Sequence, residues 1–226
     1  MDVLLFGATG MVGQGVLREC LLDPGVLRVL AVGRSATGET HEKVRDVVLP
    51  DVANLSAVES EVTGFDACFF CLGVSSAGMS EERYTELTYD LTLTVAQTLA
   101  RLNPAMAFVY VSGMGTDGSE RGRVMWARVK GKTENALLRL PFRAAYMFRP
   151  GFIIPMHGIT SRFRLYRAVF AATKPLFPLM ERRLPGYVTT TEQLGRAMIT
   201  VARDGFEKRV LETKDINRVR PGDGAP

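Results

Sequence analysis

The sequence is short of cysteine, histidine and long apolar runs, and each shortage excludes a class of protein. Its three cysteines, Cys20, Cys68 and Cys71, are too few for a disulfide framework. Its two histidines and dispersed acids show no metal-ligand spacing, so we expect no metal site. No apolar run reaches the roughly 18 residues that a membrane span requires. The chain also begins directly in a strand pattern, which leaves no room for a signal peptide, so we expect a cytoplasmic protein.

The net charge of the chain is also small. The 28 lysines and arginines exceed the 24 acids by a formal net charge of +4, which is too mild to indicate a nucleic-acid partner. The 226 residues, 46% of them hydrophobic, fit one soluble α/β domain with a sizeable core. We therefore expect a small-molecule ligand and no nucleic acid.

What the sequence does contain is a regular alternation of strand and helix patterns. The strands are expected at Asp2–Phe6, Leu27–Val32, Val44–Leu49, Ala67–Leu72, Ala107–Val111, Ala144–Phe148 and Arg209–Glu212. The helices are expected at Met11–Leu22, Leu55–Val62, after an N-cap at Ser80, and at Val124–Leu140 and Glu192–Asp204. In the helix after Ser80, the spacing predicts a buried face made of Leu87, Leu91, Val95 and Leu99.

This alternation predicts an α/β fold of the Rossmann type. Strands separated by helices require a parallel sheet with right-handed crossovers, here a doubly wound sheet of six or seven strands with helices on both faces. We expect a single domain over residues 1–226. Within it, residues 155–190 form a small substrate-side or lid segment with less regular patterning.

The most informative motif is Gly7-Ala8-Thr9-Gly10-Met11-Val12-Gly13, which follows a strand and opens a helix directly. Gly7 permits the sharp turn out of the strand, Gly10 lets the backbone approach a pyrophosphate, and Gly13 lets the helix pack close to the sheet. The pyrophosphate then lies on the amides at the helix N-terminus. The motif therefore predicts a dinucleotide site that includes Thr9, Met11 and Val12.

The residues after the second strand indicate which dinucleotide is bound. NAD enzymes usually place an acid there, which binds the ribose 2′-hydroxyl, but this chain has Gly33-Arg34-Ser35. Arg34 is suited to a 2′-phosphate and Ser35 to a further hydrogen bond, so we expect NADP in preference to NAD. Asp51 follows the third strand and either meets the adenine or caps the next segment.

Several further motifs resemble, in order, those of the short-chain dehydrogenase/reductase superfamily. After GATGMVG come Ala31-Val32-Gly33-Arg34, Cys71-Leu72-Gly73, Val111-Ser112-Gly113 and Arg149-Pro150-Gly151. The resemblance covers roughly residues 1–155 and is strongest to the extended and atypical branches, which include sugar-nucleotide epimerases and NmrA-like proteins. It implies that Cys71, Leu72 and Gly73, together with Pro150, Gly151 and Ile153, line the cofactor.

The resemblance also implies where catalysis takes place, with one departure. The family uses a serine after the fifth strand and a Tyr-x-x-x-Lys pair on the next helix, whose members share one helical face. Ser112 and Lys130 occupy two of these positions, but the tyrosine position is Trp126. An indole N–H donates a hydrogen bond and does not titrate usefully, so Trp126 is no general acid. Lys130 remains able to hold the cofactor ribose.

Three interpretations of this departure stay open. Another residue supplies the proton, with Tyr84, Tyr89, Tyr187 and His157 as candidates; or the chemistry needs no such donor; or the protein binds NADP and catalyses little. The expected function is accordingly an oxidoreductase or epimerase acting on a small carbonyl or hydroxyl compound. The alternative is a non-catalytic NADP-binding sensor or regulator.

Two weaker patterns complete the expectations. The basic and apolar segment Ser161–Leu184 fits a lid, a homodimer face or a membrane-surface helix as well as a solvated basic face. Cys68 and Cys71 lie three apart on a strand and therefore point to opposite faces, so we expect two buried thiols and no redox pair.

Overall fold

The strands and helices follow the expected alternation. The computed structural model describes residues 1–159, 177, 183–220 and 222. The strands are β1 (Asp2–Phe6), β2 (Arg28–Gly33), β3 (Val44–Val48), β4 (Ala67–Phe70), β5 (Ala107–Val111), β6 (Ala144–Arg149), β7 (Phe152–Ile154), β8 (Val188–Thr190) and β9 (Val210–Glu212). The helices are α1 (Met11–Leu22), the 3-10 turn η1 (Ser56–Val58), α2 (Glu81–Thr85), the π turn η2 (Glu86–Asp90), α3 (Leu91–Leu102), α4 (Met125–Leu137), α7 (Thr191–Asp204) and α8 (Thr213–Ile216).

Seven strands form one parallel sheet in the order β3-β2-β1-β4-β5-β6-β9. The Rossmann-type sheet expected from the sequence is thereby confirmed. The order reverses between β1 and β4, and ligands of such sheets bind at the carboxyl ends of the strands beside this reversal. A second, two-stranded parallel sheet joins β7 to β8 just beyond the carboxyl end of β6.

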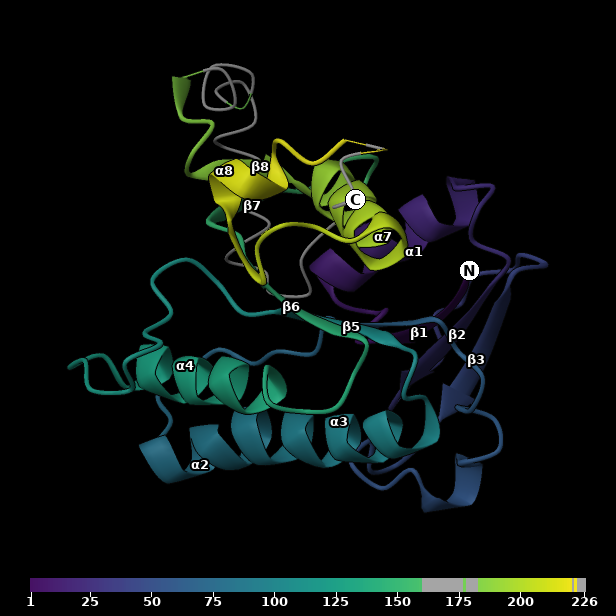
Figure 1. Ribbon diagram of the computed structural model, residues 1–226, viewed down its shortest axis with the longest axis horizontal. Helices are drawn as coiled ribbons and strands as arrows, with labels where there is room; N and C mark the ends of the chain where they lie inside the picture. Colours follow the sequence, from purple (N-terminus) through teal and green to yellow (C-terminus); the bar gives the residue numbers. More distant parts are fainter. Residues whose placement is uncertain (160–176, 178–182, 221, 223–226) are drawn as a thin grey trace.

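Helices cover both faces of the sheet, as Figure 1 shows: α1, α7 and α8 lie on one face, and α2, α3 and α4 on the other. Alternate residues of each strand point into the two layers. Val3 and Leu5 of β1 pack with α1 and α7, whereas Leu4 and Phe6 pack with α3 and α4. The continuous apolar runs seen in the sequence are therefore those of strands buried on both sides.

The helix after Ser80 differs from the expectation. Ser80 caps it as expected, because its hydroxyl accepts a hydrogen bond from the Arg83 amide. However, η2 inserts a π turn, and the fully buried residues before α3 are Tyr84 and Thr88, while Leu87 and Leu91 are only half-buried. An extra residue in one turn rotates the chain that follows, so a constant spacing of four does not describe the buried face.

Two further boundaries are corrected. The helix expected at Leu55–Val62 is reduced to the single turn η1, and β4 ends at Phe70, before Cys71 and Leu72. Of the expected lid segment, residues 160–176 and 178–182 lie outside the described residues. Among the helices that the structure describes, none has the length and apolar character needed to cross a bilayer.

The contact between α1 and α7 is unusually close because both helices carry glycine where they meet. A Cβ on Gly15 would lie 2.6 Å from the Thr191 Cβ, and one on Gly195 would lie 2.8 Å from the Glu19 Cγ. Glu19 is itself buried in this contact and binds Arg196 of α7. The glycines on the facing sides of the two helices thus fix the position of α1, whose N-terminus follows the glycine-rich turn after β1.

We predict that Gly15→Ala destabilises the fold by about 2 kcal/mol, because the added methyl overlaps α7 and overpacking a close contact typically costs 1–3 kcal/mol. Urea unfolding followed by circular dichroism measures this loss. Gly186→Ala is the matched control, since a Cβ there meets no atom within 4 Å. Equal unfolding midpoints for the two variants would contradict the close α1–α7 contact.

Candidate functional site

The turn after β1 has the geometry of a phosphate cradle. Gly7 has a φ of +82°, a left-handed conformation that L side chains rarely adopt. A Cβ on Gly13 would lie 2.0 Å from the Gly7 carbonyl oxygen, so α1 approaches the turn as closely as glycine allows. The roles expected for these two glycines therefore match their positions in the fold.

Gly10 serves the open side of the same turn. A Cβ there would meet only the Gly7 oxygen, at 3.4 Å, so this backbone faces unfilled space. Gly10 is also the N-cap of α1 and has no side chain with which to cap the amides of Met11, Val12 and Gly13. Such amides at a helix N-terminus carry partial positive charge and suit a phosphate group.

A cavity of about 250 Å³ connects this turn to the end of β2. It is lined by Gly7, Ala8, Thr9, Ala31, Val32, Gly33, Arg34, Ser35, Thr37 and Leu72. The structure thus brings together the expected residues Thr9, Arg34, Ser35 and Leu72. The lining contains an arginine and no carboxylate among the described residues, so its charge favours an anionic ligand.

The loop after β2 is held by an acid that the sequence analysis missed. Asp46 on β3 accepts hydrogen bonds from the Thr37 amide and the Thr37 hydroxyl, at 3.0–3.1 Å. This carboxylate is thereby engaged with protein donors. Asp51, in contrast, is exposed and accepts from the Ala53 amide, which is the capping role weighed for it, and it does not line the cavity.

A second cavity of about 250 Å³ lies beside the first and shares Ala8 and Thr37 with it. Its other lining residues come from α1 and from two loops: Gln14, Leu17, Arg18, Glu39, His157, Gly158 and Ile159. His157 there lies 2.5 Å from a carboxylate oxygen of Glu192. This candidate proton donor therefore lies on the α1 side of the fold and is engaged by an acid.

At the end of β5, the hydroxyl of Ser112 is turned into the protein. It donates to the buried carboxylate of Glu134 and contacts the Phe148 carbonyl oxygen at 3.2 Å. Glu134 is only 1% exposed and binds the Arg149 guanidinium through both of its oxygens, while Arg149 also binds Glu212. The hydrogen-bonding capacity of Ser112 is thus directed to a structural ion-pair network.

Lys130 lies one turn before Glu134 on α4 and points to the same strand end. Its ammonium donates a hydrogen bond to the Ser112 carbonyl oxygen. The ammonium nitrogen also lies 4.0 Å from the point where a Cβ would stand if Gly113 had one. Burial of the ammonium lowers the pKa of Lys130 to about 8, partly opposed by the negative charge of Glu134. Lys130 is therefore a group that gains and loses a proton near neutral pH.

Trp126 takes the tyrosine position on the same face of α4, and its ring packs 3.4 Å from the point where a Cβ on Gly115 would lie.

The other candidate proton donors are unsuited or lie elsewhere. Tyr84 is fully buried, and desolvation raises its pKa, so it holds its proton. Tyr89 packs beneath the Lys132 ammonium on α4. Tyr187 is 62% exposed near Gly151.

The loops after β4 and β6 complete this edge of the sheet. The Cys71 and Leu72 backbone lies 2.8 Å from the place of a Cβ on Gly7, and Gly73 follows, exposed. Burial raises the pKa of Cys71 to about 12, and Cys68 packs in the opposite layer, as expected for two unreactive thiols.

Gly151 is equally constrained by its neighbours. A Cβ on it would lie 2.3 Å from the Tyr187 oxygen and 2.5 Å from the Met114 Cε. The Pro150 carbonyl oxygen accepts from the Met114 amide, and Ile153 lies within β7. The loops after β5 and β6 are thus joined directly beside Lys130 and Trp126.

Besides Asp46, three residues of this site were not expected from the sequence: Glu134, Thr37 and Met114. Glu134 would have been the easiest of the three to infer from the sequence, because it follows Lys130 by four residues and so shares its helical face. Thr37 and Met114 are ordinary loop residues, and only the folded loops place them beside the cavity and beside Gly151.

Comparisons with known proteins agree with this geometry. Residues 3–124 match the NAD dependent epimerase/dehydratase family. Protein fmp52, mitochondrial, of Emericella nidulans is 30% identical over 67% of this chain and 66% of its own length. Protein FMP52, mitochondrial, of Eremothecium gossypii is 27% identical over 96% of each chain. Protein HTATIP2 of Rattus norvegicus is 26% identical over 95% of this chain and 87% of its own.

Solved structures share the fold at lower identity. The Bordetella bronchiseptica enzyme WbmF in complex with NAD+ superposes with a TM-score of 0.65 at 16% identity, covering 100% of this chain and 81% of that one. MoeE5 in complex with UDP-glucose and NAD also gives 0.65 at 16% identity, covering 96% and 79%. At these identities the likeness establishes the fold alone.

The expectation of a cytoplasmic location is wrong by this comparison, because the FMP52 relatives are named mitochondrial. The expectation rested on unpaired cysteines, on the lack of a long apolar run and on a strand pattern that begins at the first residues. Unpaired cysteines and the lack of an apolar run do not distinguish one reducing compartment from another, and the strand pattern argued only against a secretory signal peptide.

We predict that Glu134→Ala lowers the free energy of unfolding by about 3 kcal/mol, because it leaves Arg149 short of its buried partner. Urea denaturation at neutral pH measures the loss. Glu59→Ala, which breaks an ion pair with Arg101 that is exposed on both sides, is the matched control and should cost under about 1 kcal/mol. Similar losses in both variants would show that the Glu134 network is not structural.

Proposed function

Because this chain belongs to the NAD dependent epimerase/dehydratase family, we propose that it is an NADP-dependent oxidoreductase acting on a small carbonyl or hydroxyl compound. The observation that carries the proposal is the cavity between the turn after β1 and the end of β2, whose described lining residues include Arg34 and no acid. An enzyme selective for NAD would need a carboxylate for the ribose 2′-hydroxyl there. Asp46, the nearest acid on β3, instead binds Thr37.

The residues present fit such a cofactor. The amides after Gly10 would hold the pyrophosphate, and Arg34 and Ser35 would hold a 2′-phosphate. Lys130 and the loop at Pro150, Gly151 and Ile153 would hold the nicotinamide end. When bound in reduced form, the dinucleotide would supply a hydride to the substrate carbon.

Lys130 would supply the matching proton. With Trp126 in the tyrosine position and the Ser112 hydroxyl engaged by Glu134, Lys130 is the residue of the family's catalytic motif that can still exchange a proton at the end of β5. Its ammonium would protonate the carbonyl oxygen, which leaves an alcohol and a neutral amine that regains its proton from water. A general acid works best when its pKa lies near the working pH, and burial brings Lys130 to about 8.

We predict that Arg34→Ala raises the Kd for NADP about tenfold to hundredfold and leaves that for NAD within about twofold. The reason is that a hydrogen bond to a charged group is worth about 1.5–3 kcal/mol and only NADP carries the 2′-phosphate. Isothermal titration calorimetry measures both constants. Arg45→Ala on β3, whose guanidinium pairs with Glu61, is the matched control. Equal weakening of both nucleotides by Arg34→Ala would defeat the cofactor assignment.

We also predict that the rate of carbonyl reduction by NADPH falls above about pH 8, because only the protonated Lys130 donates. Lys130→Met should lower the rate about a hundredfold or more, the usual worth of a general acid, and should remove the pH dependence. Lys130→Arg is the control that keeps the charge without titrating in this range. The measurement is NADPH absorbance with a panel of aldehydes and ketones between about pH 6 and 10, a range that extends roughly two units on either side of the Lys130 pKa of about 8.

A flat pH profile, or full activity of Lys130→Met, would refute the role of Lys130. NADPH binding without turnover of any compound in the panel would favour the alternative, a non-catalytic NADP-binding regulator.

A further inference from the structure

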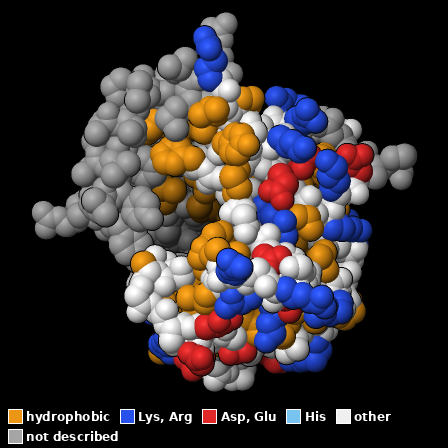
Figure 2. Space-filling model, turned by 90° about the vertical axis from the view of Figure 1, so that its left-hand side faces the viewer, with side chains coloured by type: hydrophobic (Ala, Val, Ile, Leu, Met, Phe, Trp, Pro, Cys, Tyr) orange, Lys and Arg blue, Asp and Glu red, His pale blue; other side chains and the backbone are white. Residues whose placement is uncertain are grey.

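The carboxyl edge of the sheet carries a group of partly exposed apolar side chains next to Lys130. We name it the apolar rim and define it by Met114, Val124, Trp126, Phe152, Leu184 and Tyr187. Figure 2, which looks onto this edge, shows apolar side chains gathered along one side of a hollow in the surface. Val124, Leu184 and Tyr187 are among the most exposed large apolar residues that the structure describes.

The rim comes from two parts of the chain that meet at Gly151. Met114, Val124 and Trp126 belong to the loop after β5 and to the start of α4. Phe152 and Tyr187 belong to the β7–β8 region, where the Phe152 amide donates to the Tyr187 carbonyl oxygen at 2.8 Å. A Cβ on Gly151 would lie 2.5 Å from the Met114 Cε and 2.3 Å from the Tyr187 carbonyl oxygen, so the two parts are in contact. Within the first part, the Trp126 ring lies 3.4 Å from the point where a Cβ on Gly115 would lie.

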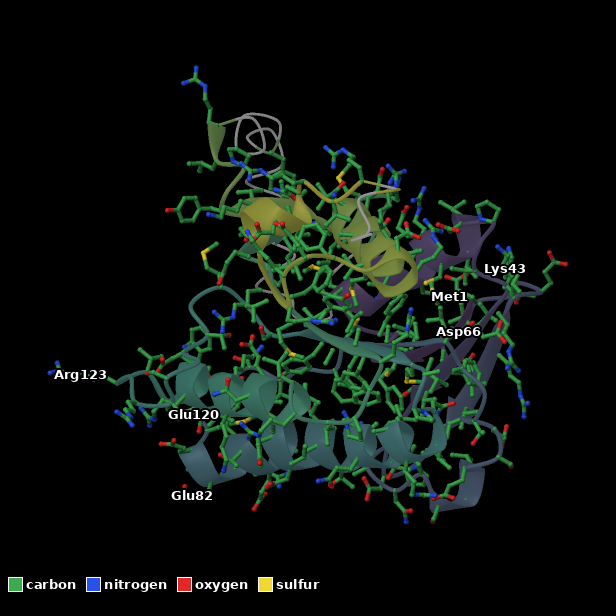
Figure 3. The ribbon with its side chains drawn as sticks, viewed as in Figure 1. Met1, Lys43, Asp66, Glu82, Glu120 and Arg123 are labelled. Atoms are coloured by element: carbon green, nitrogen blue, oxygen red, sulfur yellow. The ribbon has the colours of Figure 1, made fainter. Side chains whose placement is uncertain are left out.

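Several charged groups beside the rim are already engaged. Asp117 accepts hydrogen bonds from Ser119, Arg121 and Gly122 of its own loop, which lower its pKa to about 2. Arg128 binds Glu81, and Arg149 binds Glu134 and Glu212. The side chain of Arg123, labelled in Figure 3, extends away from the molecule. Among the described residues, these charged groups next to the rim are thus bound to protein partners, which leaves the apolar side chains of the rim as the surface next to Lys130.

We propose that this hollow binds an apolar carbonyl compound, one whose carbonyl carries an aliphatic chain or an aromatic ring, and not a nucleotide sugar. The inference rests on the proposed function, because the carbonyl has to reach Lys130 while its apolar part lies against the rim. A nucleotide sugar would bring two phosphates and several hydroxyls to Met114, Trp126 and Leu184, which offer them little hydrogen bonding. An apolar chain would instead remove its own surface and that of the rim from water.

Trp126 makes the proposal directly measurable, because it is the one tryptophan of the sequence and belongs to the rim. The NADP+-loaded protein is titrated with methyl ketones from butanone to decanone while tryptophan fluorescence is followed. No reduction occurs with the oxidised cofactor, so the titration reports binding alone. We expect the Kd to fall about threefold to fourfold for each added methylene, the usual gain for apolar surface removed from water. UDP-glucose should leave the fluorescence unchanged.

A Kd that does not depend on chain length, or UDP-glucose binding more tightly than any ketone, would overturn the proposal. Failure of the underlying function is recognised separately, because calorimetry with NADP+ tests cofactor binding and the ketone series is repeated without cofactor. If NADP+ fails to bind while the ketones keep their chain-length dependence, the apolar site stands and the oxidoreductase proposal falls.

Rim variants test the location of the site. Leu184→Ser should weaken decanone binding about tenfold, whereas Leu27→Ser should leave it unchanged. Leu27 is the matched control. Its side chain is 67% exposed, against 45% for Leu184, but it directly precedes β2 and so lies at the amino end of the strands, away from the rim. Flotation of the wild-type protein with anionic phospholipid vesicles, together with ketone binding that ignores Leu184→Ser, would show instead that the rim docks on a lipid surface, and this would overturn the proposal.

Discussion

The close approach of α1 to the turn after β1 is the constraint on which the rest of the site depends. Gly13 touches the Gly7 carbonyl, and this contact places the first amides of α1 at the open end of the sheet. The glycine contacts between α1 and α7 then fix the helix from its other side. A larger residue at any of these positions would move the helix outward. The backbone of Gly7 and Gly13 is in close contact, whereas the side of the turn at Gly10 faces unfilled space. The cavity next to Arg34 begins at this turn.

A second constraint is the buried ion pair between Glu134 and Arg149, which also engages the Ser112 hydroxyl. Burying a carboxylate is costly unless its oxygens are satisfied, and here serine and arginine share that task. The consequence for chemistry is that Ser112 contributes its carbonyl oxygen, not its hydroxyl, to the region of Lys130. Together with Trp126 in the tyrosine position, this leaves a lysine of lowered pKa beside an apolar surface. The site thus keeps the frame of its family, and in the function we propose the proton comes from Lys130 in place of a tyrosine.

Much of the fold follows from local patterns. The strands β1 and β5 and the helix α1 have the expected bounds, because apolar runs and the Pro24-Gly25 pair that follows α1 are local signals. The helix after Ser80 was harder to predict, since the π turn at Glu86–Asp90 shifts the buried face from Leu87 to Thr88. A π turn is adopted when packing on the neighbouring layer favours it, and its effect on which residues are buried is not visible in the spacing of leucines.

The sequence alone determined the parallel sheet, the phosphate turn and the choice of Arg34 in place of an acid, because glycine spacing and strand periodicity act over a few residues. The tertiary structure decided the rest. Only the fold turns Ser112 toward Glu134, binds Asp46 to Thr37 and collects the apolar rim from segments far apart in the sequence. The physical reason is that the pKa of Lys130 and the polarity of its surroundings depend on burial and on neighbours from other elements, and these exist only after the chain has packed.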